Sequence, residues 1–124
     1  MIEASANKSP FFTIITVCRN AGKLLERTMR SVLSQSFDSF EYLIKDGLSS
    51  DGSLRALSRI DKIRLISKPD TGIYDAMNQA LEYSMGNFVC FMNTGDTFYS
   101  SETLTRVAQF IHQNPEKSVY LGNA

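Results

Sequence analysis

The apolar residues of this 124-residue chain gather in short continuous runs, which are separated by segments with apolar residues at helical spacing. The runs are rich in β-branched and aromatic residues without polar alternation, which is typical of strands covered on both faces. They predict strands over 11–18, 42–44, 63–66, 87–92 and 118–121. The intervening segments predict helices over 20–35, 51–60, 73–84 and 102–114. This alternation favours an α/β fold with a Rossmann-like, mostly parallel sheet and helices on both faces.

Polar residues and glycines beside these segments indicate where the helices begin and end. The expected N-terminal caps are Asn20, Asp51 or Ser53, and Asp70 or Thr71. Gly86 is expected to end the helix over 73–84, and Pro115 the last helix.

Length and composition describe one ordinary domain rather than a nucleic-acid-binding or membrane-spanning chain. The 13 basic residues balance the 13 acidic ones, so net charge provides no attraction to nucleic acid. No apolar run approaches the roughly 18 residues that cross a bilayer. The leader 1–10 is polar and lacks a secretory signal, which predicts a cytoplasmic protein. The domain over 11–124 ends without a covering helix, so we expect it to be truncated at its C-terminus and to belong to a longer enzyme.

Several residues of types that are often catalytic or metal-binding in other proteins are expected to be structural in this chain. Cys18 and Cys90 lie inside apolar runs and predict buried free thiols. His112 is the only histidine and predicts a surface position, and no Cys/His cluster has zinc spacing. Tyr74 and Tyr83 are expected to pack rather than to act as acids.

Two acidic loops follow predicted strands. Asp46 ends one strand and is followed by Gly47, by Ser49 and by backbone amides at a helix start, which suits a nucleotide. An Asx-turn with a helix cap is the alternative interpretation of this loop. The second loop, 93–96, ends in Asp96. Since the carboxyl ends of parallel strands meet at one edge, the two loops predict a site there for a metal-bound phosphate or a sugar nucleotide.

A third polar segment, 67–78, holds more polar groups than a connection needs. Asp75 and Asn78 are three residues apart and can face the same side of a helix. A ligand role for Asp70, Asp75 or Asn78 is one interpretation, and for Asp75 an interaction with the helix dipole is the other.

The order of these motifs resembles the family-2 glycosyltransferases, which have the GT-A fold. Four strings carry the resemblance, over 12–17, 46–53, 68–78 and 91–96. The string Gly-Ile-Tyr-Asp-Ala-Met-Asn and the Asn-x-Gly-Asp ending resemble a bacterial subgroup that builds exopolysaccharides such as colanic acid.

The resemblance implies a donor-binding portion for a nucleoside-diphosphate sugar, in particular a UDP-sugar. It implies that Thr16, Cys18 and Arg19 line the nucleotide site and that Asp46 accepts a hydrogen bond from the base. The full set of expected nucleotide-binding residues is Thr16, Cys18, Arg19, Asp46, Ser49, Asp70, Asp75, Asn78 and Asn93.

The loop over 93–96 occupies the place of the family's Asp-x-Asp motif, which holds Mg²⁺ or Mn²⁺ on the diphosphate. The two carboxylates of that motif fall on Asn93 and Gly95, which leaves Asp96 as the expected metal ligand. Leu48 also departs from the family, since a small or acidic residue is usual at its position.

The family's catalytic base deprotonates the acceptor hydroxyl in an inverting displacement, and we expect it beyond Ala124. The chain is therefore expected to bind the donor without turnover. The resemblance implies a saccharide or lipid-linked acceptor and leaves peripheral membrane association of the whole enzyme open. The alternatives are a non-catalytic nucleotide-binding module, which Asn93 and Gly95 favour, and a nucleotidyltransferase, whose Gly-rich loop the chain lacks.

Overall fold

The computed structural model describes residues 9–55 and 57–116. Their centre is a four-stranded parallel sheet in the order β3-β2-β1-β4. The strands are β1 (Phe12–Cys18), β2 (Phe40–Asp46), β3 (Ile63–Ser67) and β4 (Phe88–Phe91). The helices are α2 (Lys23–Leu33), α3 (Ile73–Leu81), α4 (Thr103–Gln113) and the short 3₁₀ helix η1 (Leu57–Arg59).

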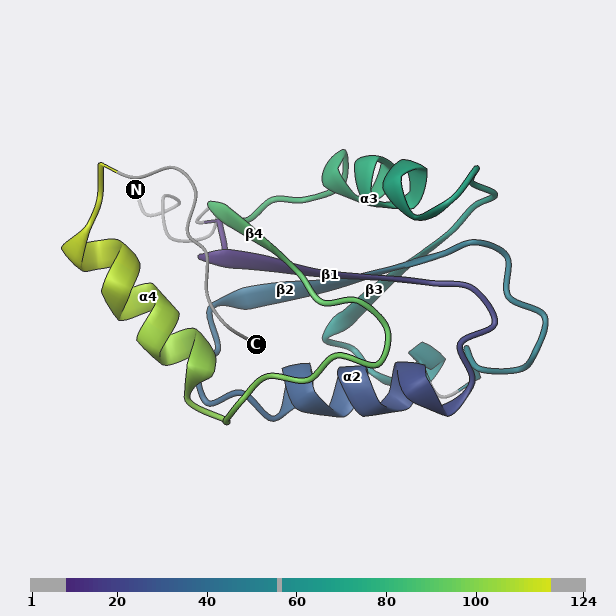
Figure 1. Ribbon diagram of the computed structural model, residues 1–124, viewed down its shortest axis with the longest axis horizontal. Coiled ribbons are helices and arrows are strands. Elements are labelled where there is room, and N and C mark those ends of the chain that lie inside the picture. The colour runs from purple at the N-terminus through teal and green to yellow at the C-terminus, as the bar shows by residue number, and fades with distance from the viewer. Residues whose placement is uncertain (1–8, 56, 117–124) are drawn as a thin grey trace, which may run out of the picture.

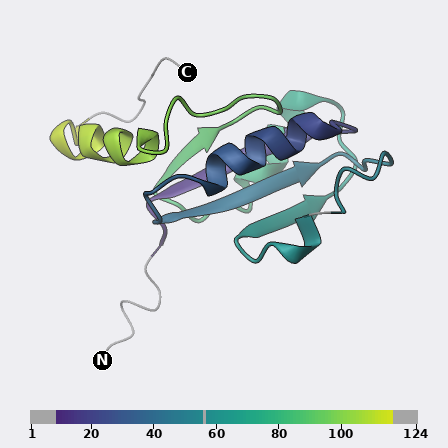
Figure 2. The ribbon, with the colours of Figure 1, turned by 90° about the horizontal axis from the view of Figure 1, so that it is seen from below.

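Helices cover both faces of the sheet, as the sequence predicted. Figure 1 shows α3 above the sheet, α2 below it, and α4 at the left, beside the ends where the strands begin. In the view from below, α2 runs along the strands and α4 lies beyond it, near the ends where the strands begin (Figure 2). The α/β class and the parallel sheet are therefore confirmed.

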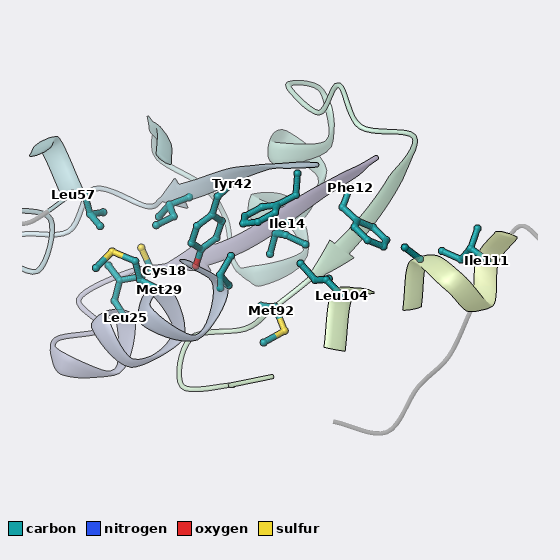
Figure 3. Packing of buried hydrophobic residues seen from close by; sticks show 14 residues of the cluster. Phe12, Ile14, Cys18, Leu25, Met29, Tyr42, Leu57, Met92, Leu104 and Ile111 are labelled. Carbon is teal, nitrogen blue, oxygen red and sulfur yellow. The ribbon is translucent and has the colours of Figure 1, made fainter. Parts of the chain in front are cut away.

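The central strands supply both layers of the core because successive side chains of a strand point to opposite faces. Phe12 and Ile14 pack with α2 and α4 in the larger cluster, part of which is shown in Figure 3. Ile15 and Val17 pack with Ala76 and neighbours of α3 on the other face. Every residue of β1 is buried, which confirms that its continuous apolar run marks a strand covered on both sides.

Strand β4 is less enclosed than its apolar sequence predicts. Phe88 and Cys90 pack against the larger cluster, whereas Val89 and Phe91 are 37% and 36% exposed. Within the described residues β4 pairs with β1 alone, and α3 packs on β1 and β2. The prediction of a fully buried strand over 87–92 is thus wrong, because β4 lies at the edge of this sheet and one of its faces is only partly covered.

The first helix begins later than predicted, and Asn20 is not its cap. Asn20 has a left-handed φ of 51°, and α2 starts after Gly22. The Asn20 side-chain oxygen instead accepts hydrogen bonds from the backbone N–H groups of Ser50 (2.7 Å) and Asp51 (3.2 Å). Asn20 therefore ties the loop after β1 to the loop after β2.

The predicted helix over 51–60 is wrong except for η1. The backbone N–H groups of Arg55, Leu57 and Ile60 donate to carbonyls three residues back, as in isolated turns and a 3₁₀ helix, and do not form a continuous α-helical ladder. The N–H of Ser53 donates instead to the carboxylate of Asp51 at 2.9 Å. That carboxylate also accepts the N–H of Gly22 at 3.0 Å. The segment consequently forms a loop that is held against the start of α2.

Neither Asp70 nor Thr71 caps α3, whose N-terminal cap is Gly72. Asp70 accepts the Gly72 N–H at 3.2 Å, and Asp75 in the first turn accepts the Thr71 N–H at 2.9 Å. These carboxylates hold the loop before the helix, where backbone groups lack helical partners.

Gly86 does not end α3, which stops at Leu81. It lies against β1, where its N–H donates to Thr13 Oγ1 at 2.8 Å. A Cβ atom at this position would lie 2.6 Å from the backbone of Phe12 and Thr13. Glycine is needed here because two backbone segments approach each other closely.

The last described helix, α4, agrees with its prediction to within a residue at each end. The leader 1–8 and the predicted strand over 118–121 lie outside the described residues. Among the described residues, no helix has the length and apolar character that a membrane span requires.

Replacing Gly86 by Ala tests this close approach. We expect the free energy of unfolding to fall by about 2–3 kcal/mol, because the added methyl group meets backbone that cannot move aside. Urea unfolding followed by circular dichroism measures the change. Met85→Ala is the matched control, since the Met85 side chain is 57% exposed and its removal should change stability by less than about 0.5 kcal/mol. Equal stability of the Gly86→Ala variant and the parent would contradict the packing argument.

Candidate functional site

The carboxyl ends of the strands form one edge of the molecule, at the right in Figure 1. The chain builds β1, β2 and β3 outward in one direction and then places β4 on the other side of β1. The order of strands therefore reverses between β1 and β4. In open parallel sheets, ligands bind beyond the carboxyl ends at such a reversal.

Asp46, at the end of β2, is fully buried and surrounded by hydrogen-bond donors. Its carboxylate accepts the N–H groups of Leu48 and Ser49, the hydroxyl of Ser49, the hydroxyl of Ser67 at 2.8 Å and the thiol of Cys18 at 3.8 Å. A buried carboxylate needs such compensation because burial removes its hydration. Asp46 thereby joins the ends of β1, β2 and β3.

Cys18 and Thr16 also lie inside the fold. Burial, together with the nearby Asp46 carboxylate, raises the pKa of Cys18 to about 12, so the thiol is protonated at neutral pH. Thr16 is fully buried, and its hydroxyl shares a 2.8 Å hydrogen bond with that of Tyr42. Cys18 is a buried free thiol, as predicted, whereas Cys90 is free but only half-buried.

Lys45 is a residue of this region that the sequence reasoning missed. Its side chain is fully buried, and its ammonium donates to Asp70 Oδ2 at 2.8 Å and to the Lys68 carbonyl at 2.8 Å. This contact lowers the pKa of Asp70. A lysine inside an apolar run that ends at an aspartate is the signal that could have revealed a buried ion pair.

The other predicted residues of this edge reach the surface to different degrees. Arg19 and Asn78 are exposed, while Ser49 and Asp75 are partly buried. Asp75 Oδ2 also accepts a hydrogen bond from Gln79 Nε2 at 3.0 Å, so this carboxylate has a structural task at the start of α3.

The loop over 93–96 lies against β1 and α2. Thr94 Oγ1 donates to the Val17 carbonyl at 2.8 Å, and the Gly95 N–H donates to Thr28 Oγ1 at 2.7 Å. Asn93 and Asp96 are exposed. Because β1 lies between β2 and β4, Asp46 and this loop flank the end of the same strand.

Asp46 and Asp96 thus lie at the same edge of the sheet, but their side chains differ in access, since one is enclosed and the other faces solvent. Among the described residues, no three His, Cys, Asp or Glu side chains gather closely enough to hold a metal ion by themselves. A cavity of about 290 Å³ lies between the start of α2 and the segment 51–57, and its wall contains none of the predicted nucleotide or metal residues.

Two side chains expected to be structural behave differently. Tyr74 lies in the first turn of α3 and is 80% exposed, so the prediction that it packs is wrong. Tyr83 does pack on the smaller core cluster, and its hydroxyl accepts a hydrogen bond from Lys68 Nζ at 2.6 Å. His112 is exposed as predicted, with its ring against that of Phe11.

The model of the family described as "Glycosyl transferase family 2" matches residues 13–123, which is most of the chain. The chain belongs to glycosyl transferase family 2. It is 28% identical over 120 residues to a PGL/p-HBAD biosynthesis glycosyltransferase of Mycobacterium tuberculosis, covering 93% of this chain and 47% of that protein. It is 31% identical over 110 residues to the putative teichuronic acid biosynthesis glycosyltransferase TuaG of Bacillus subtilis, covering 85% of this chain and 43% of that protein. This family-2 chain therefore spans less than half the length of these relatives.

Solved structures confirm the GT-A type of fold. The mannosyltransferase PcManGT from Pyrobaculum calidifontis, in complex with GDP-Man and Mn²⁺, superposes with a TM-score of 0.75 at 22% identity, over 84% of this chain and 33% of that one. S. aureus TarS 1-349, in complex with UDP-GlcNAc, gives a TM-score of 0.78 at 23% identity, over 89% of this chain and 37% of that one. At such identities the likeness concerns the fold alone.

Replacing Lys45 by Met tests the buried ion pair. The variant leaves the Asp70 carboxylate, whose side chain is 11% exposed, without its cation, so we expect a loss of about 3 kcal/mol in the free energy of unfolding. Chemical unfolding measures it, and Lys23→Met provides a control at an exposed lysine. A Lys45→Met variant as stable as the parent would show that the pair contributes nothing.

The same pair predicts a pH dependence. Since Lys45 lowers the pKa of folded Asp70, its stabilisation is complete above the unfolded pKa of about 3.9 and is lost as the pH falls through the lower folded value. The stability difference between the parent and Asp70→Asn should stay constant from pH 7 to about 5 and shrink below pH 4. Unfolding curves across this range check it, and a difference that does not vary with pH contradicts the assignment.

Proposed function

We propose that this chain is the donor-binding portion of a glycosyltransferase that moves a sugar from a nucleoside-diphosphate sugar, in particular a UDP-sugar, to an acceptor hydroxyl with inversion. The observation that carries the proposal is the gathering of polar loops at the reversal of strand order between β1 and β4. Family membership supports the reaction class. The GDP-Man and UDP-GlcNAc bound by the two neighbouring structures support a nucleotide-sugar donor.

The predicted donor-site residues divide into two groups by access. Arg19, Asn78 and Asn93 are exposed, and Ser49, Asp70 and Asp75 are partly exposed, so all six can meet a nucleotide. Thr16, Cys18 and Asp46 are buried, and their polar atoms bond to protein groups. We propose that these three residues support the loops of this edge through hydrogen bonds inside the protein.

The oxygen ligands around Asp96 fit part of the coordination that a hard divalent cation needs. Mg²⁺ and Mn²⁺ are commonly held by one or two carboxylates together with substrate phosphates and water. Asp96 offers one exposed carboxylate and Asn93 an exposed amide oxygen, so the diphosphate would have to complete the coordination. Such a cation neutralises the charge that develops on the departing diphosphate. The Mn²⁺ of the PcManGT complex supports this part of the proposal.

The wider context is proposed from the relatives. The PGL/p-HBAD and teichuronic acid glycosyltransferases support a role in glycolipid or polysaccharide synthesis, with a saccharide or lipid-linked acceptor. The exopolysaccharide subgroup of the colanic-acid type, a cytoplasmic location and peripheral membrane association stay predictions from the sequence. The acceptor site and the catalytic base are proposed to lie outside this chain.

A non-catalytic nucleotide-binding module is the second candidate. The observation in its favour is the pair Asn93 and Gly95 at the places of the metal-binding carboxylates, because an amide is a weaker ligand than a carboxylate. The two candidates differ in whether a cation strengthens nucleotide binding.

Titration calorimetry with UDP, in the presence and absence of Mn²⁺, tests the proposal. We expect binding that Mn²⁺ strengthens at least about tenfold, and an Asp96→Asn variant that loses this gain while keeping its metal-free affinity. Asp38→Asn is the matched control, since Asp38 is exposed and precedes β2 at the opposite edge of the sheet. Metal-independent binding would favour the non-catalytic module, and no binding of UDP, GDP or their sugars would overturn both candidates.

A further inference from the structure

Leu48 has an unusual backbone conformation for its residue type. Among the described residues, only Asn20 and Leu48 have a positive φ without being glycine, with values of 51° and 66°. Asparagine tolerates this region, and the hydrogen bonds of its side chain explain its presence at position 20. Leucine has neither advantage, and its side chain is 53% exposed. A strained, exposed apolar residue is one whose presence the fold does not explain.

The groups around Leu48 fix its position. Its N–H donates to Asp46 Oδ2 at 3.1 Å, and the preceding N–H, of Gly47, donates to the Cys18 carbonyl at 2.9 Å. The following N–H, of Ser49, also donates to Asp46. The backbone is thus held on both sides of Leu48, while the side chain is left facing solvent.

Burial decides which residue at this point can touch a ligand. Asp46 is fully buried with its oxygens already accepting bonds, whereas Leu48 is exposed two residues further on, at the carboxyl edge. The Ser49 hydroxyl accepts the Asn20 N–H at 2.8 Å, so the loops after β1 and β2 meet beside it. Small-molecule sites combine apolar side chains with a few well-placed polar groups, and Leu48 offers an exposed apolar side chain beside these polar loops.

We infer that Leu48 is the apolar contact for the base of the donor nucleotide. Asp46 affects base binding indirectly, because it fixes the loop that exposes the Leu48 side chain. This inference rests on the proposed function. The base is the flat, largely apolar part of such a donor, while the ribose and the diphosphate are polar. Leu48 is therefore a specificity-determining residue, and Asp46 is a positioning residue.

The strain supplies a test that separates this role from a structural one. Leu48→Gly relieves the left-handed conformation, so the denaturant midpoint should rise, and it removes the base contact, so UDP affinity should fall about five- to tenfold. Leu48→Ala keeps the strain and removes most of the side chain, so it should lose similar affinity without gaining stability. Leu81→Ala, at an exposed leucine in the last residue of α3, is the matched control and should bind UDP like the parent.

Binding of inorganic pyrophosphate with Mn²⁺, measured by the same calorimetry, isolates the base. We expect both Leu48 variants to bind pyrophosphate as the parent does, because pyrophosphate has no base. Unchanged UDP affinity in both variants would overturn the inference and leave the proposed function standing. An equal loss for UDP and pyrophosphate would also overturn it, since the loop as a whole would then be disturbed. A parent that binds no nucleotide would overturn the proposed function and this inference with it.

Discussion

The burial of two consecutive charged residues at the end of β2 is the constraint on which the candidate site depends. Lys45 and Asp46 point to opposite faces of the sheet, and both are fully buried. Each must therefore find partners inside the protein. Lys45 finds them in the segment after β3, through Asp70 and the Lys68 carbonyl, and Asp46 finds them in the loop after β2 and in Ser67. The end of β2 thereby holds in place the loop after β2 and the segment after β3.

This arrangement changes how the acidic loop is understood. A carboxylate at a strand end suggests direct contact with a ligand, yet Asp46 is enclosed by neutral donors and a thiol. Its charge is used to shape the loop, and the exposed groups of that loop are the ones that can meet a donor. Gly47 belongs to the same arrangement, since a Cβ there would lie 2.9 Å from Asp70 Oδ2. The acidic residue at the other side of β1, Asp96, is exposed at the surface.

Much of the fold could be predicted from the sequence because it depends on periodicity. Continuous β-branched and aromatic runs identified β1 and the other strands, and helical spacing located α2, α3 and α4 to within a few residues. Errors arose where tertiary contacts override local preference. Asn20 looked like a cap but bonds to a distant loop, and Gly86 looked like a helix stop but makes room for β1. The edge position of β4, which leaves Val89 and Phe91 partly exposed, follows from strand order, which local pattern does not contain.

The sequence by itself determined the α/β class, the family resemblance and the placing of polar loops after the strands, because these depend on residue type and spacing along the chain. Only the tertiary structure decided which of the polar residues are accessible. Asp46, Thr16 and Cys18 are inside, while Asp96 and Asn93 are outside. The physical reason is that exposure and ion pairing depend on neighbours from other strands: Lys45 meets Asp70 across 25 residues of chain, a contact that no local pattern encodes.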